Sequence, residues 1–125
     1  MKSVILLVED DKDDALLTQL ALGNPVVTVP TGESALEYLK RHEPPMLLLV
    51  DLGLPLMSGV ELIHTVRNTP ATAHIPIVIL TGRKDDEEVY QALGADAYLM
   101  KPLDVQELTD VLRAHGLALG IMKRH

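Results

Sequence analysis

The sequence predicts an α/β fold, a doubly wound parallel sheet of five strands with five helices, in one domain spanning residues 1–125. Short runs rich in Val, Leu and Ile alternate with segments whose apolar residues recur at helical spacing, which is typical of strand-helix-strand units. The central run, Met46 to Val50, is apolar throughout, as expected of a strand buried on both faces of a parallel sheet. It ends on the single carboxylate of Asp51, where such sheets bind ligands.

The predicted strands are short, and residues that break regular structure bound them. Pro44-Pro45 precedes the central strand, and Gly53 and Pro55 follow it. The first strand ends on acids, as the central one does. The five strands are residues 4–8, 26–29, 46–51, 77–80 and 97–100.

The first three predicted helices follow the first three strands. Asp13 and Asp14 lie near the start of the first, where the helix dipole favours negative charge, and Gly23-Asn24-Pro25 ends it. Thr31-Gly32 turns into the second, and Pro70 requires the third to end by Thr69. The residues at helical spacing are Ala15, Leu16, Leu17, Leu20 and Ala21 in the first, Ala35, Leu36 and Leu39 in the second, and Val60, Leu62, Ile63 and Val66 in the third.

Two more helices are predicted near the carboxyl terminus. The fourth begins with the acidic run Asp85 to Glu88 and has Gly94 as its C-cap. Asp104 can cap the fifth, whose apolar residues are Val105, Leu108, Val111 and Leu112. Residues 116–125 are predicted to be a C-terminal extension. It is too apolar for a free tail, so we expect it to cover the core or to contact a second subunit.

Composition excludes several functions. The chain has no Phe and no Trp, so aliphatic residues must build the core and no aromatic platform exists for stacking bases. The formal net charge of -7 repels phosphate backbones, so we expect no direct nucleic-acid partner. The absence of Cys excludes disulfides and thiolate chemistry and is compatible with a reducing cytoplasm. No segment is apolar for long enough to be a signal peptide or to span a bilayer, which predicts a cytoplasmic protein with no membrane partner.

Polar residues follow the carboxyl ends of four predicted strands: Glu9-Asp10, Asp51, Thr81 and Lys101. If the strand order is 2-1-3-4-5, the first and third strands are neighbours, and Asp10 lies beside Asp51. Two carboxylates about 5 Å apart repel by roughly 3 kcal/mol at an effective dielectric near 20, so the cluster needs a proton or a cation. Oxygen ligands without His or Cys suit Mg²⁺. Lys101 and the Thr81 hydroxyl then supply the positive charge and the donor that a phosphoryl group requires.

The motifs LLVEDD, LLLVDLGLPLMSG, ILTG and GADAYLMKP resemble the receiver domain of two-component response regulators, of the single-domain type similar to chemotaxis regulators. The resemblance covers nearly the whole chain and implies a flavodoxin-like fold. It implies that Asp51 is the phosphoacceptor. It also implies that Mg²⁺ is held by Asp10, by Asp51 and by the carbonyl of Gly53, with Glu9 acting through a water.

The same resemblance assigns the remaining site residues. Thr81, Gly82 and Lys101 would bind the phosphoryl group, and Thr81 and Tyr98 would form the switch. The bond between Lys101 and Pro102 would be cis. Ser58 occupies a position where receivers often have Asp or Asn. Gly53 has no side chain at a position where a side chain often influences dephosphorylation. The resemblance therefore does not predict the lifetime of the phosphoryl group.

The function implied is that of a stand-alone response regulator in a two-component phosphorelay. A sensor histidine kinase would supply the phosphoryl group, and a downstream protein or an identical subunit would recognise the switched surface. The stretch DDKDDALLTQLAL resembles the small receivers that partner bacterial phytochrome kinases. Such a protein is not an enzyme, although it assists its own Mg²⁺-dependent phosphorylation and dephosphorylation.

Other interpretations remain at this stage. Asp51 alone could cap a turn, and Asp11 fits a helix cap better than a metal ligand. A hydrolase of the haloacid dehalogenase type uses the same residue types, but it expects a second Asp two residues after the first, where this chain has Gly53. A degenerate receiver that acts without phosphorylation is the third alternative. The intact acid pair, Thr81 and Lys101 argue against it.

Overall fold

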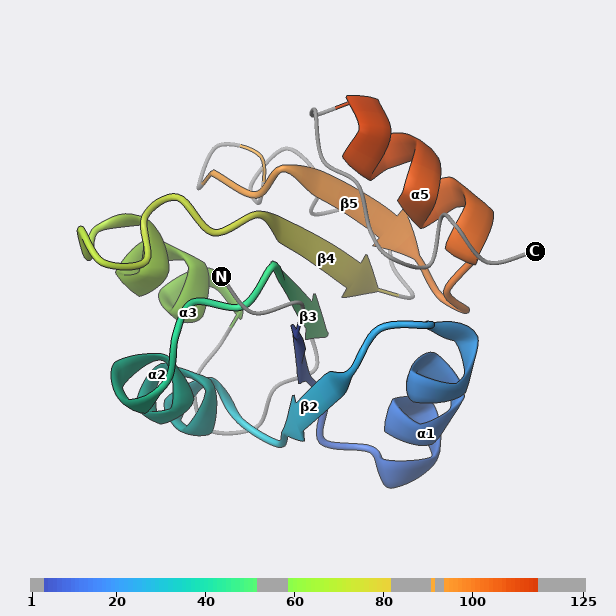
Figure 1. Cartoon of the computed structure of the whole chain (residues 1–125), viewed down its shortest axis with the longest axis horizontal. Helices are drawn as coiled ribbons and strands as arrows, with labels where there is room; N and C mark the ends of the chain where they lie inside the picture. The colour runs from blue at the N-terminus through green and yellow to red at the C-terminus, as the bar shows by residue number, and fades with distance from the viewer. Residues whose placement is uncertain (1–3, 52–58, 82–90, 92–93, 115–125) are drawn as a thin grey trace.

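The computed structural model describes residues 4–51, 59–81, 91 and 94–114. Its centre is a five-stranded parallel sheet in the order β2-β1-β3-β4-β5, so the predicted sheet and strand order are confirmed (Figure 1). The polar residues at the strand ends therefore share one edge, because all five strands point the same way. The strands are β1 (Ile5–Val8), β2 (Val26–Val29), β3 (Leu47–Asp51), β4 (Ile77–Thr81) and β5 (Ala97–Met100).

Four helices accompany the sheet within the described residues. They are α1 (Lys12–Ala21), α2 (Gly32–Arg41), α3 (Gly59–Arg67) and α5 (Val105–Ala114). The predicted fourth helix, which would begin at Asp85, falls mostly outside the described residues, and the extension 116–125 falls wholly outside them. None of the helices in the part of the chain that the structure describes is long and apolar enough to cross a bilayer.

The helices cover both faces of the sheet. Helices α1 and α5 lie on one side, and α2 and α3 lie on the other (Figure 1). Successive strand residues point to opposite faces, so Ile5 and Leu7 belong to the cluster under α1 and α5, whereas Leu6 and Val8 belong to the cluster under α2 and α3. The core is aliphatic, as the composition predicted.

Polar side chains cap three helices. The Asp11 carboxylate accepts a hydrogen bond from the Asp14 N–H at 2.9 Å, which makes Asp11 the N-cap of α1. Thr31 caps α2 in a reciprocal box with Ser34. Asp104 Oδ1 accepts from the N–H groups of Gln106 and Glu107 at the start of α5. Each cap satisfies N–H groups that a helix leaves unpaired, and the predicted caps at Asp11 and Asp104 are confirmed.

The leucines of helix α1 do not lie on its buried face. Leu16, Leu17 and Leu20 are 53%, 65% and 74% exposed, whereas Ala15 and Thr18 are buried. Helical spacing therefore predicted the helix correctly but did not identify its buried side. The buried residues of α1, Ala15 and Thr18, are both small.

Arg67 joins three segments at the amino edge of the sheet. Its guanidinium donates to the carbonyls of Ala73, Ile75 and Gly94 at 3.0, 2.6 and 2.9 Å, and it pairs with Asp96 Oδ2 at 3.0 Å. Gly94 has φ of +105°, and a Cβ there would lie 3.1 Å from Arg67 Cγ, so this position suits glycine. The side chain of Arg67 thus fixes the end of α3 to the start of β4 and to the entry of β5.

Candidate functional site

Three charged residues lie at the carboxyl edge of the sheet, on the face that α1 and α5 cover. Glu9 follows Leu7 by two positions, Asp51 follows Leu49, and Lys101 follows Leu99, and all three leucines belong to the cluster under α1 and α5. Because side chains two residues apart in a strand share a face, the three charged groups emerge on the same side of the sheet. β1, β3, β4 and β5 are adjacent in that order, so the charges meet at the carboxyl edge.

The Lys101 ammonium lies among three carboxylates. Its Nζ is 3.0 Å from Asp51 Oδ2, 3.2 Å from Glu9 Oε1 and 3.3 Å from Asp14 Oδ2. The side chains of Glu9 and Asp51 are 2% and 10% exposed, whereas that of Asp14 is 47% exposed. Ion pairs are strong where water is excluded, so the contacts with Glu9 and Asp51 hold Lys101 more firmly than the contact with Asp14.

Glu9, Asp10 and Asp51 form an acidic cluster. Each offers a carboxylate oxygen, and these oxygens lie within 4.8 Å of one another. Asp10 is exposed, so the cluster opens to solvent on one side. Carboxylate oxygens at this spacing, with an open side for water, are a donor set that fits a hard divalent cation such as Mg²⁺.

The cluster changes the acidity of Glu9. The pKa of Glu9 is raised to about 7, chiefly by burial and further by the hydrogen bond and the repulsion from Asp51. The Asp11 N–H, which donates to Glu9 Oε2 at 3.3 Å, and Lys101 act in the opposite direction. Without a cation, the Glu9 carboxyl group is therefore only partly ionised near neutral pH.

Lys101 stays charged in this environment. Burial lowers the pKa of Lys101, but the ion pairs with Asp51 and Glu9 raise it by more, so the net shift is upward. The site therefore keeps one fixed positive charge beside its acids, which is the arrangement that an incoming anion needs.

Thr81 and Tyr98 lie on the other side of the sheet. Thr81 is 3% exposed and follows Ile79, which belongs to the cluster under α2 and α3. Tyr98 is half-buried and packs against that same cluster. Ile79 is paired with Tyr98, and Thr81 is paired with Met100, so Thr81 and Tyr98 are diagonal neighbours on one face.

The structure thus brings together most of the residues that the sequence singled out. Glu9, Asp10, Asp51 and Lys101 meet at one edge, and Thr81 ends the adjacent strand. The Lys101–Pro102 bond is cis, which is the isomer that the resemblance implies. Gly53 and Gly82 lie outside the described residues.

Sequence reasoning missed Asp14. It was interpreted only as a charge at the amino end of a helix, yet its carboxylate contacts Lys101. The sequence feature that could have pointed to Asp14 is its position three residues after the cap residue Asp11. That spacing places both side chains at the same end of the helix, but it does not show how the helix is rotated toward the crevice.

Comparison with known proteins identifies the family. The family model of the response regulator receiver domain matches residues 5–113. The transcriptional regulatory protein AfsQ1 of Streptomyces coelicolor is 38% identical over 117 residues, which cover 88% of this chain and 49% of AfsQ1. The chain spans half or less of the length of the first curated relatives that it matches.

Solved structures show the same fold. The bacteriophytochrome response regulator AtBRR is 29% identical and matches with a TM-score of 0.86, covering 99% of both chains. The bacteriophytochrome response regulator RtBRR is 33% identical with a TM-score of 0.85, covering 99% of this chain and 84% of that one. The chain therefore belongs to the receiver domain family of response regulators, whose members carry phosphorylation signals in two-component systems.

Proposed function

We propose that this receiver accepts a phosphoryl group from a sensor histidine kinase on Asp51 and uses it to switch a protein-interaction surface. The observation that carries the proposal is the ion pair of 3.0 Å between Lys101 Nζ and Asp51 Oδ2, beside the acidic cluster. Asp51 ends β3, the middle strand of the sheet, and its side chain is 10% exposed. A phosphoryl group placed there would find a fixed ammonium on one side.

In the proposed transfer, one bond to phosphorus forms and one breaks. A carboxylate oxygen of Asp51 forms a P–O bond while the P–N bond of the kinase's phosphohistidine breaks. The electron pair of that bond returns to the imidazole, which takes up a proton from solvent. Lys101 neutralises part of the charge on the transferred oxygens, so it lowers the energy of the transition state more than that of the free reactants.

A divalent cation, which we propose is Mg²⁺, would be held by Asp10 and Asp51 directly, by the Gly53 carbonyl, and by Glu9 through water. When bound, it would neutralise charge on the phosphoryl oxygens during transfer. This role agrees with the all-oxygen donor set at the strand edge, and receiver domains bind Mg²⁺ or Mn²⁺ at such a pocket. The protein Rcp1, which is 30% identical to this chain, has been solved in a Mn²⁺-bound form.

The proposed switch links Thr81 to Tyr98. Asp51 is paired with Leu80, so Thr81 is the next residue of the adjacent strand and ends it at the same carboxyl edge. A phosphoryl group on Asp51 would extend past that edge and offer oxygens to the Thr81 hydroxyl, and the new hydrogen bond would be charge-assisted. It exists in only one arrangement of Thr81, so it can shift the population toward that arrangement. Tyr98 is the diagonal neighbour of Thr81 on the same face, so we propose that Tyr98 moves inward behind it.

Beryllofluoride, a stable mimic of the phosphoryl group, tests the proposed acceptor. With Mg²⁺ already present, we expect beryllofluoride to give saturable amide NMR shifts in wild type and no further shifts in Asp51→Asn, because an amide oxygen does not replace the carboxylate that the mimic needs. Asp13→Asn is the matched control, since it removes the same charge from an exposed residue of α1. Equal responses in wild type and Asp51→Asn would exclude Asp51 as the acceptor.

Thr81→Ala tests the coupling. The variant should bind Mg²⁺ and beryllofluoride but should lose the shifts at Tyr98, because it lacks the hydroxyl that distinguishes the two states. The lost hydrogen bond is worth about 1.5 to 3 kcal/mol, which corresponds to a ten- to hundredfold change in the population ratio. If Tyr98 responds in Thr81→Ala as it does in wild type, the coupling takes another route.

We further propose a cytoplasmic protein that forms one receiver domain with the extension 116–125. The cognate kinase would be a phytochrome, which the likeness to bacteriophytochrome response regulators supports. The reader of the switched surface would be a downstream protein or a second copy of the chain. Phosphotransfer from candidate kinases, followed by electrophoretic separation of the phosphorylated form, identifies the kinase as the one with the fastest transfer.

A further inference from the structure

Asp14 differs from the other two carboxylates that contact Lys101. Glu9 and Asp51 belong to the acidic cluster at the strand ends, whereas Asp14 comes from the first turn of α1. Its backbone is fixed there, because the Asp14 N–H donates to the N-cap carboxylate of Asp11 at 2.9 Å. The position of the Asp14 side chain is therefore set by the start of the helix and not by the sheet.

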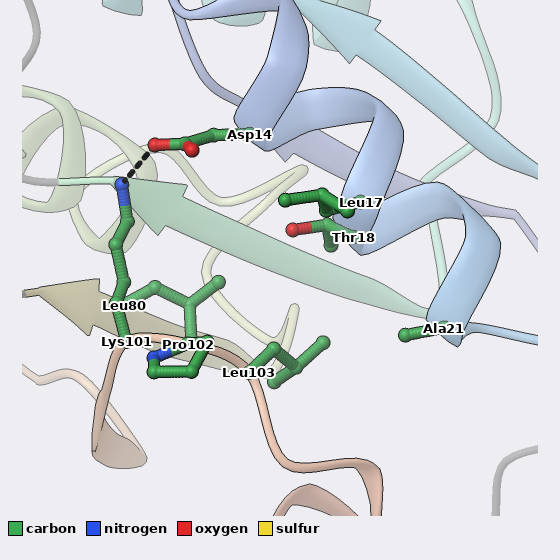
Figure 2. A pocket seen from close by; sticks show the side chains of 8 residues that line it. All are labelled: Asp14, Leu17, Thr18, Ala21, Leu80, Lys101, Pro102 and Leu103. Carbon is green, nitrogen blue, oxygen red and sulfur yellow. Dashed lines mark hydrogen bonds and ion pairs between the residues drawn. The ribbon is translucent and has the colours of Figure 1, made fainter.

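Asp14 and Lys101 both line a pocket and pair with each other at its edge. Figure 2 shows the Lys101 side chain extending toward Asp14, with the ion pair of 3.3 Å between them. The pocket holds about 440 Å³ and lies between α1 and the segment that follows β5, with Leu17, Leu80 and Leu103 in its lining. The ion pair thus joins α1 to the end of β5, on the α1 side of the crevice.

The three contacts of Lys101 differ in how easily they can be given up. The Glu9 side chain is 2% exposed, so water could not solvate it in place of Lys101. The Asp14 side chain is 47% exposed, and water can solvate it once Lys101 leaves. Of the three, Asp14 is the partner that Lys101 can release at the smallest cost.

We propose that Asp14 is a positioning residue for the phosphoryl site, which holds the Lys101 ammonium toward α1 until an anion at Asp51 draws it away. This inference rests on the proposed function of Asp51. A phosphoryl group carries more negative charge than the carboxylate it modifies and adds acceptor oxygens, so it competes with Asp14 for the same ammonium. Asp14 also repels that anion directly, and both effects weaken anion binding.

The first measurement compares Asp14→Asn with Asp13→Asn. Both remove one charge from the first turn of α1, but Asp13 is exposed and is not among the partners of Lys101. At saturating Mg²⁺, Asp14→Asn should bind beryllofluoride about three- to tenfold more tightly than wild type, as expected for loss of a like charge a few ångströms away. Asp14→Asn should at the same time bind Mg²⁺ alone no more tightly than wild type, because removing a negative charge does not favour a cation. Asp14→Ala provides a second variant with the same expected direction.

The second measurement follows the Lys101 side chain by NMR, with its Cε and Hε resonances assigned from their loss in Lys101→Met. In the free protein, Asp14→Asn should shift these resonances, and Asp13→Asn should leave them in place. With Mg²⁺ and beryllofluoride bound, wild type and Asp14→Asn should give nearly the same Lys101 resonances, because Lys101 has left Asp14. A role of Asp14 in the helix alone would not produce this convergence.

The outcomes separate the inference from the function on which it rests. If beryllofluoride binds wild type, but Asp14→Asn and Asp13→Asn bind it with the same affinity, the inference is wrong and the assignment of Asp51 as phosphoacceptor is unaffected. If the Lys101 resonances differ equally between wild type and Asp14→Asn in both states, Lys101 does not leave Asp14, and the inference is again wrong. If beryllofluoride does not bind wild type at all, the proposed function and the inference fail together.

Discussion

Replacing Arg67 with alanine should lower the free energy of unfolding by about 2 to 4 kcal/mol. The guanidinium makes a largely buried ion pair with Asp96, at 19% and 32% side-chain exposure, and donates to three backbone carbonyls. Alanine removes all four contacts, and within the described residues the Asp96 carboxylate then keeps the hydrogen bond that it accepts from the Ile77 N–H at 2.8 Å. In a domain of this size, the loss corresponds to a fall in melting temperature of roughly 10 °C. Urea unfolding monitored by circular dichroism measures it.

Arg41→Ala is the matched control for this prediction. Arg41 pairs with Glu37 at 2.8 Å, but the two side chains are 71% and 53% exposed, so the pair contributes less than about 1 kcal/mol. Arg67→Lys should fall between wild type and Arg67→Ala, because an ammonium cannot reach four acceptors in a fixed planar arrangement. Equal losses in Arg67→Ala and Arg41→Ala would show that the contacts of Arg67 do not stabilise the fold.

Without divalent cations, the protein should lose stability as the pH rises from about 5 to 8, and Glu9 should be the cause. The folded state raises the pKa of Glu9 from 4.5 to about 7, so between these values the folded protein holds a proton that the unfolded chain has lost. This contribution is fully present below pH 4.5 and is lost as the pH passes 7. The shift sets an upper limit of about 3 kcal/mol.

Glu9→Gln tests this by carrying a neutral side chain at every pH. The free energy of unfolding is measured in urea with a chelator present, at pH 5, 6, 7 and 8. The value for Glu9→Gln should rise relative to that of wild type at each step and should exceed it at pH 8. Glu33→Gln, which changes an exposed acid in the first turn of α2, should track wild type. A difference between Glu9→Gln and wild type that stays constant with pH would exclude Glu9 as the titrating group.

Much of the fold was predictable because the central strands are buried on both faces. Leu47 to Val50 must be apolar on each side, and this requirement leaves an unbroken signal in the sequence. Asp51 stands out against that run, and the same is true of Glu9 after Ile5–Val8. Once the strand order is known, both acids must meet, so the acidic cluster followed from the sequence without any information on side-chain contacts.

The rotation of α1 was not predictable in the same way. Its leucines have the spacing of a buried face, yet Leu16, Leu17 and Leu20 are exposed and the small residues Ala15 and Thr18 face the sheet. Burial depends on how closely the helix approaches the sheet, which is a tertiary property. The contact between Asp14 and Lys101 depends on that rotation, and it was missed for this reason.

The alternation that brings Glu9, Asp51 and Lys101 onto one face also limits how this chain can change in length. Inserting one residue into β3 ahead of Asp51 would turn its carboxylate to the face of Thr81 and Tyr98, away from Lys101. Inserting two would restore the face but would move the carboxylate about 7 Å along the strand. The lengths of β1, β3 and the end of β5 are therefore expected to stay fixed during evolution for as long as the site is used.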